Sequence, residues 1–193
     1  MTSYIYQSTI ANKCFTRDEL NLTEFEDCTF IDCDFGACNF LGVTFLSCSF
    51  RYCQFEGAQI NHVALRSVKF VNCNLKNLNF AMCDRLLFEV EFDHCRLDFS
   101  KFYTLPIHAA NFTNYSLLAV DFMKTNLQGV LFDYCDMHRA EFEVALAQKA
   151  NFYSSENYSI NPSKTKLNKA VFASTKLEGL VNQIGLKIHS FCK

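Results

Sequence analysis

The sequence predicts an all-β solenoid in which the chain turns a corner every five residues. A large apolar residue recurs at every fifth position, a period that fits neither an α-helix nor a flat strand. A small residue precedes most of these large residues by two positions. In the first half the large series is Phe25, Phe30, Phe35, Phe40, Phe45, Phe50, Phe55, Ile60, Leu65, Phe70, Leu75 and Phe80, and the small series is Cys28, Cys33, Cys38, Val43, Cys48, Cys53, Ala58, Val63, Val68 and Cys73.

One large and one small side chain then point inward on each five-residue side of the coil. Four such sides close a square coil of 20 residues, and successive coils stack at about 4.8 Å, the spacing between hydrogen-bonded strands. Phe occupies most of the large positions, and each buried Phe contributes about 1.5–3 kcal/mol to stability. The prediction therefore places a continuous hydrophobic core along the axis of a rod.

The period slips by two residues at Asp84–Leu86, where we expect a bulge or a short loop. It resumes at Leu87 with a second large series. That series is Leu87, Phe92, Leu97, Phe102, Ile107, Phe112, Leu117, Phe122, Leu127, Phe132, Met137, Phe142, Ala147 and Phe152, and its small positions are Val90, Cys95, Ser100, Ala110, Val120, Thr125, Val130, Cys135, Ala140, Ala145 and Ala150. Oversized Leu105 and Tyr115 and the missing N–H of Pro106 predict a distorted coil around 105–115.

The chain is divided into an N-terminal cap (1–19), the solenoid (20–152) and a C-terminal segment (153–193) that caps the rod and forms a dimer. Asn161-Pro162 is expected to end the regular coils, and 169–173 to form a strand. Thr175–Glu178 matches a capping box at the start of an amphipathic helix that Gly185 ends. The expected dimer interface is Leu177, Leu180, Val181, Ile184, Leu186 and Ile188, the last two on a short terminal strand. The same helix face is also suited to cover the last coil.

Composition excludes several functional classes. The net charge is −2, so a strongly basic nucleic-acid binder is not expected. Residues 1–13 are mostly polar and no apolar run reaches about 18 residues, so we expect neither a secretion signal nor a membrane span. Nine of the eleven Cys occupy inward positions of the repeat, whereas Cys14 and Cys192 lie outside it as the expected exposed thiols. A reducing cytoplasm is the expected location.

No arrangement of residues indicates catalysis, and we expect neither an enzyme nor a cofactor. The column of Cys and the Cys135–His138 spacing raise a metal or redox site as an alternative. Core packing explains the column better, since Ala, Val and Thr fill the same position. Five carboxylates near the start of the rod are either a solvated surface or an acidic patch for a basic partner. They are Glu24, Glu26, Asp27, Asp32 and Asp34.

The pentad over residues 20–152 resembles the pentapeptide-repeat proteins. The segment 157–188 is similar to the end of the quinolone-resistance members of that family and their uncharacterised bacterial relatives. The resemblance implies a right-handed quadrilateral β-helix about as wide as duplex DNA, joined end to end into a dimer. It also implies binding to DNA gyrase or topoisomerase IV by mimicry of DNA, with protection from quinolones. The alternative is a protein-interaction scaffold with no topoisomerase role.

Overall fold

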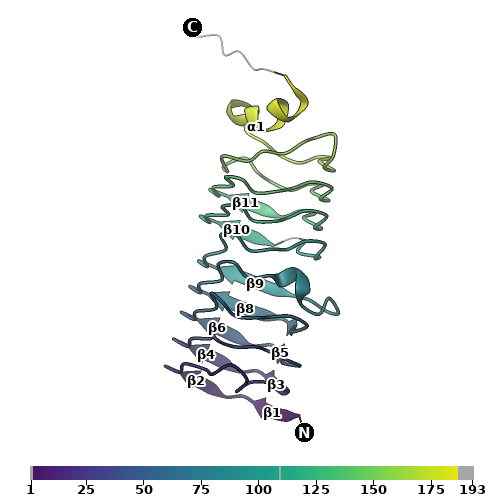
Figure 1. Ribbon diagram of the computed structural model, residues 1–193. Helices are drawn as coiled ribbons and strands as arrows, with labels where there is room; N and C mark the ends of the chain where they lie inside the picture. The colour runs from purple at the N-terminus through teal and green to yellow at the C-terminus, as the bar shows by residue number, and fades with distance from the viewer. Residues whose placement is uncertain (1, 109, 187–193) are drawn as a thin grey trace.

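The computed structural model describes residues 2–108 and 110–186. It is a rod of stacked coils with a short helical segment at its C-terminal end (Figure 1), so the predicted β-solenoid is confirmed. The strands are β1 (Ser3–Tyr6), β2 (Thr9–Ala11), β3 (Thr23–Glu26), β4 (Thr29–Ile31), β5 (Thr44–Leu46), β6 (Ser49–Arg51), β7 (Ala64–Arg66), β8 (Val68–Val71), β9 (Val90–Asp93), β10 (Asn111–Thr113) and β11 (Leu131–Asp133). The helical turns are η1 (Phe80–Met82), η2 (Ser174–Lys176), α1 (Glu178–Val181) and η3 (Asn182–Ile184).

Parallel pairing joins residues one coil apart and gives the rod four walls. Wall A is the sheet β1-β3-β5-β7, and wall B is the sheet β2-β4-β6-β8-β9 followed by β10-β11. Walls C and D consist of isolated bridges, such as Asp34 with Gln54 on wall C and Asn39 with Gln59 on wall D. The register in the first coils is 20 residues, as in the pairing of Phe25 with Phe45. The predicted square coil is therefore present.

Phe rings fill the axis of the rod in columns. Phe30 stacks on Phe50 of the next coil with centroids 4.8 Å apart and planes 8° apart. Phe45 meets Phe50 of its own coil edge to face at 5.0 Å. Both arrangements are favourable for aromatic rings, and most inward residues of both rows are buried, with Ala58, Val90 and Ala110 partly buried. The interior is consequently a solid core.

The small inward position also has a hydrogen-bonding role. The Thr125 hydroxyl donates to the carbonyl of Phe102 at 2.8 Å, 23 residues earlier. The Ser155 hydroxyl and the Cys48 thiol donate to the equivalent carbonyls, the thiol to Phe25 at 3.5 Å. Cys, Ser and Thr therefore interchange here because each offers a small side chain with a donor, a role that size alone did not predict.

The corners of the coils impose a left-handed backbone on ordinary residues. Gly42, Gly57 and Gly129 occupy three corners, but most corners carry side chains, including the β-branched Val144 at φ +61°. The left-handed conformation disfavours residues with a Cβ by about 1–2 kcal/mol. The left-handed conformation persists because the backbone N–H at the corner is hydrogen-bonded to the next coil. The Val144 N–H, for example, donates to Lys164 O.

We expect Val144→Gly to stabilise the protein by about 0.5–1 kcal/mol, because relief of left-handed strain outweighs the added flexibility of the unfolded chain. Val144 is exposed, so little packing is lost. Chemical denaturation measures the change. Val171→Gly is the matched control, since Val171 is similarly exposed but has no positive φ, and it should destabilise. Destabilisation by both variants would contradict the account of the corners.

The phase slip lies between wall A and wall B. Ala64 pairs with Asp84 at a register of 20, but Val68 pairs with Val90 at a register of 22. The two extra residues form a projecting turn before β9 (Figure 1), in which Leu86 and Leu87 are 65% and 69% exposed. The inward position predicted for Leu87 is therefore wrong. The buried Phe88 lies inward instead, because the insertion turns the chain one residue later.

The coils extend beyond both boundaries of the predicted solenoid. The segment predicted as an N-terminal cap contains β1 and β2, which pair with β3 and β4 and form the outermost coil. At the other end, Asn151 pairs with Val171, and Phe152 stacks on Phe172 at 5.0 Å. Pro162 lies in a turn within this last coil, so the predicted stop at Asn161-Pro162 is wrong.

The C-terminal helix is shorter than predicted and begins without the capping box. Neither η2 nor α1 has a side-chain cap hydrogen bond. Gly185 ends η3 at φ +76°, as predicted. Gly179 is required for a different reason: a Cβ there would collide with the Tyr158 carbonyl oxygen and ring. The Gly179 carbonyl accepts the Ile160 N–H at 2.9 Å, so the helix docks on the last coil by close backbone approach.

Candidate functional site

The ladder of paired strands is interrupted once along wall B, between β9 and β10. Among the described residues, no bridge joins Asp84 to Pro106 on wall A or Arg96 to Ser116 on wall C. Wall D alone continues, through the bridge between Lys101 and Asp121. Two neighbouring coils therefore separate on three walls and stay joined on the fourth. The predicted distortion around 105–115 is confirmed.

Tyr115 holds these two coils apart. It occupies the column in which Cys73, Cys95 and Cys135 lie, and its buried ring packs edge to face on Phe112 at 5.7 Å. Its hydroxyl accepts the Cys95 N–H at 3.4 Å, in place of direct backbone pairing. Burial raises the pKa of Tyr115, so the phenol stays neutral.

Asp98 supplies the second side-chain link across the break. Its Oδ1 accepts from the Ser116 hydroxyl at 2.6 Å and from the Leu118 N–H at 3.2 Å. Its Oδ2 lies 3.5 Å from Lys76 Nζ on the coil below. This nearly buried carboxylate therefore ties three successive coils together on wall C. The two cavities of the break lie along walls A and B.

The break leaves backbone groups unpaired on wall B. At the corner after each strand, the N–H normally donates to the coil above: Asn72 to Asp93 O and Asn114 to Asp133 O, both at 2.8 Å. His94 is the residue between them in this column, and the described part of the chain gives its N–H no such backbone acceptor. The upper edge of β9 and the lower edge of β10 therefore face each other as open strand edges.

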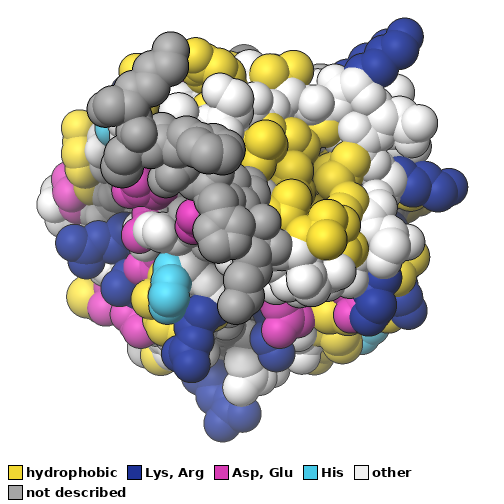
Figure 2. Space-filling model, turned by 90° about the horizontal axis from the view of Figure 1, so that it is seen from above, with side chains coloured by type: hydrophobic (Ala, Val, Ile, Leu, Met, Phe, Trp, Pro, Cys, Tyr) yellow, Lys and Arg dark blue, Asp and Glu magenta, His cyan; other side chains and the backbone are white. Residues whose placement is uncertain are grey.

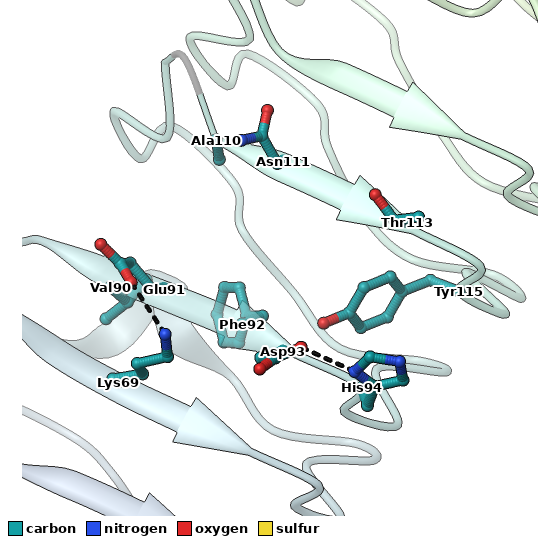
Figure 3. Close-up of a pocket in the computed structure, with 10 residues that line it drawn as sticks. All are labelled: Lys69, Val90, Glu91, Phe92, Asp93, His94, Ala110, Asn111, Thr113 and Tyr115. Carbon is teal, nitrogen blue, oxygen red and sulfur yellow. Dashed lines mark hydrogen bonds and ion pairs between the residues drawn. The ribbon is translucent and has the colours of Figure 1, made fainter.

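A continuous hollow, which we call the fissure, follows the break around the corner from wall A to wall B. It comprises two adjoining cavities of about 360 and 460 Å³, both lined by Val90, Glu91 and Ala110. Figure 3 shows the first cavity, with the Tyr115 ring reaching from the upper coil toward β9. Lys69 Nζ lies 3.6 Å from Glu91 Oε2 at its lower rim. His94 Nδ1 lies 2.6 Å from Asp93 Oδ1 at its end.

We expect the His94 amide to exchange with solvent at least about tenfold faster than the amides of Asn72 and Asn114, because its N–H lacks the backbone acceptor that theirs have. Hydrogen exchange followed by NMR measures this. The two asparagines are internal controls at equivalent corners. Equal protection at all three corners would show that the ladder is closed in solution.

The five predicted acidic residues do not form one flat patch. Glu24 and Glu26 project from β3 on wall A, Asp27 and Asp32 lie at corners with positive φ, and Asp34 lies on wall C, the opposite side of the coil. Asp34 Oδ1 accepts the Gly36 N–H at 2.8 Å within a turn. The carboxylates therefore encircle part of the rod.

Tyr4 is coupled to the acidic residues of wall A. Its hydroxyl donates to Glu26 Oε2 at 2.5 Å, and this hydrogen bond to a carboxylate raises the pKa of Tyr4 to about 12. The exposed Tyr4 ring stacks on Tyr6 with centroids 6.3 Å apart. The five-residue pattern gives no signal for this tyrosine pair, because both residues precede the repeat predicted from residue 20.

The residues predicted for the dimer interface divide into two groups. Leu177, Leu180 and Val181 are partly buried, and Leu180 packs against the core of its own chain. Ile184 and Leu186 are 46% and 58% exposed, and Ile188 lies outside the described residues. Figure 2 shows an apolar area on this end of the rod with Lys and Arg side chains around the rim.

The thiols of the repeat are buried and unpaired with one another. Burial raises the pKa of Cys38 to about 11 and those of Cys48 and Cys83 to about 12. These thiols therefore stay neutral, which disfavours nucleophilic chemistry. Cys14 is exposed as predicted, and Cys192 lies outside the described residues.

Cys135 is buried while His138 is exposed, so their side chains diverge. Within 2–108 and 110–186, no group of His, Cys, Asp and Glu is arranged to hold a metal ion. The same residues contain no helix that is long and apolar enough to cross a membrane.

Residues 28–66 match the family model of pentapeptide repeats in eight copies. Together with the square coil, this match shows that the chain contains pentapeptide repeats and folds as a pentapeptide-repeat β-helix. No curated protein matches it.

Several solved structures are similar to this chain at low sequence identity, and the first of those described next shares its fold. A trypsin-treated form of QnrB1, a plasmid-mediated fluoroquinolone resistance protein, is 12% identical with a TM-score of 0.65, over 98% of this chain and 100% of its own. Full-length QnrB1 is 13% identical with a TM-score of 0.48, over 95% and 100%. HetL, a pentapeptide-repeat protein involved in heterocyst differentiation regulation from the cyanobacterium Nostoc sp. strain PCC 7120, is 16% identical with a TM-score of 0.43, over 97% and 92%.

Proposed function

We propose that this chain acts without chemistry, by presenting the outer surface of its rod to a protein partner. The observation that carries the proposal is the solid interior, where stacked aromatic rings leave no room for a substrate. The buried thiols of Cys38, Cys48 and Cys83, whose pKa values are raised by burial, point the same way, since they offer neither a nucleophile nor a ready metal ligand. They also fit a reducing cytoplasm.

The partner that we propose is a type II topoisomerase, DNA gyrase or topoisomerase IV. Support comes from the fold, which is similar to that of a fluoroquinolone resistance protein, and from the rod form, which suits mimicry of duplex DNA. The carboxylates around the first coils would face the basic groove of such an enzyme. Binding there would protect the enzyme from quinolones.

A gyrase supercoiling assay with ciprofloxacin tests this proposal. We expect addition of the protein to restore supercoiling, and we expect Glu24→Lys with Glu26→Lys to reduce the restoration several-fold by reversing charge on wall A. Glu141→Lys is the control, because this exposed carboxylate lies on wall D of a distant coil. If supercoiling and ciprofloxacin tolerance in cells are both unchanged, the partner is not a topoisomerase.

A scaffold that binds another protein is the second candidate. The near balance of 18 basic and 20 acidic side chains favours it, since a close mimic of DNA would carry a larger negative charge. In both candidates the outer surface of the rod binds a protein, and only the identity of that protein differs. The gyrase assay separates them.

We further propose that two copies join through their C-terminal ends. Ile184 and Leu186 are exposed apolar side chains beside the docked helix, and burying such residues favours association. Leu180 would meanwhile keep the helix on its own last coil.

Sedimentation equilibrium should give twice the mass of one chain, and Ile184→Asp should reduce it to a single chain. Tyr134→Asp is the control, because Tyr134 is also a large exposed side chain, 68% exposed against 46% for Ile184, and lies far from this end. A dimeric Ile184→Asp variant, or a monomeric parent protein at about 100 μM, would contradict the assignment.

A further inference from the structure

We propose that the fissure between β9 and β10 binds an extended peptide segment with basic side chains as an added β-strand. The inference does not rest on the topoisomerase proposal. It rests on the open strand edges, on the charge around them and on the single wall that joins the two coils.

The open edges supply the backbone part of the site. Elsewhere on wall B every strand has a neighbour on each side, except at the two ends of the sheets. At the break, the upper edge of β9 and the lower edge of β10 face each other without pairing, and the His94 N–H has no backbone acceptor among the described residues. Edges of this kind bind extended peptides by adding a strand, in which main-chain hydrogen bonds provide affinity.

The negative charge of the fissure favours a peptide with basic side chains. Three carboxylates line the two cavities: Glu89, Glu91 and Asp93. Lys69 is the one lysine or arginine among the described lining residues, and Glu91 already pairs with it. Glu91 and Asp93 alternate along β9 with the inward Phe92, so both face outward, where alternate side chains of an added strand would meet them. Arg or Lys at those positions would complement the carboxylates.

The fissure has an apolar rim that suits the remaining side chains. Leu87 and Phe88 line the second cavity together with Pro106 and Ile107, and Leu87 is one of the most exposed large apolar residues in the described chain. An occupant that alternates basic and apolar residues would place its apolar side chains against this rim. Such alternation is the ordinary pattern of a strand with two different faces.

Admission of a strand would require the two coils to separate further, by about one strand spacing of 4.8 Å. The core is slightly widened here: the rings of Phe92 and Phe112 are 6.1 Å apart, compared with 5.8 Å for Phe70 and Phe92 in the paired ladder below and 5.3 Å for Phe112 and Phe132 above. Wall D would act as the hinge, through the bridge between Lys101 and Asp121. The Tyr115–Cys95 and Asp98–Ser116 hydrogen bonds would open on the opposite side.

The probe is the peptide acetyl-Arg-Val-Arg-Val-Arg-amide, titrated into the full-length protein. NMR chemical shifts should change at 90–94 and 111–113, and hydrogen exchange at His94 should slow at least tenfold at saturation. The acidic counterpart acetyl-Glu-Val-Glu-Val-Glu-amide should leave these signals unchanged. Shifts spread over the whole acidic surface would mean non-specific attraction and would overturn the proposal.

The matched variants separate charge recognition from folding. Glu91→Gln with Asp93→Asn should weaken peptide binding at least tenfold, whereas Glu141→Gln with Glu156→Gln, the same loss of charge on walls D and C, should weaken it less than twofold. Both pairs lie on the outer surface of the coils, and unfolding curves check that stability is kept. Equal weakening by the two pairs, or unchanged exchange at His94 with saturating basic peptide, overturns the proposal. Neither result depends on the gyrase assay.

Discussion

The parallel ladder between successive coils is the constraint on which this structure depends. A backbone group must meet its partner one coil away, so most sides are held to five residues and most corners to a left-handed residue. That spacing in turn decides which side chains point inward and stack. The large and small positions of the sequence are therefore a consequence of main-chain pairing, and the aromatic core stabilises what the pairing permits.

The fissure lies where this constraint is relaxed. Two extra residues before β9, an oversized Tyr115 and the missing N–H of Pro106 all fall within two neighbouring coils. Side chains then replace main-chain links, with the Tyr115 hydroxyl and the Asp98 carboxylate spanning the break. Elsewhere the rod presents outward side chains and two ends, so the fissure is distinctive in offering backbone donors and acceptors to another molecule.

The repeat made the fold and the buried residues predictable, because a period of five has few structural solutions. Leu105 and Tyr115 stood out as too large, so the distorted region was also predictable. The inward position of Phe88 was not predictable. An insertion can be accommodated at several neighbouring residues, and core packing decides which side chain, Leu87 or Phe88, points inward. The capping box at Thr175 failed because the close contact of Gly179 with Tyr158, invisible in the sequence, positions the helix. The open edges of the fissure were equally hidden, since pairing across 20 residues leaves no local signal.

The wall that continues past the break gives the rod a preferred direction of curvature. With Lys101 and Asp121 joined and no bridge between these two coils on the other three walls, the described rod would bend most easily about wall D, where bending opens or closes the fissure on the opposite side. A partner with a curved surface would therefore fit this rod most easily when the curvature lies in the plane through walls B and D. Shape selection of that kind needs no movement of the aromatic columns on either side.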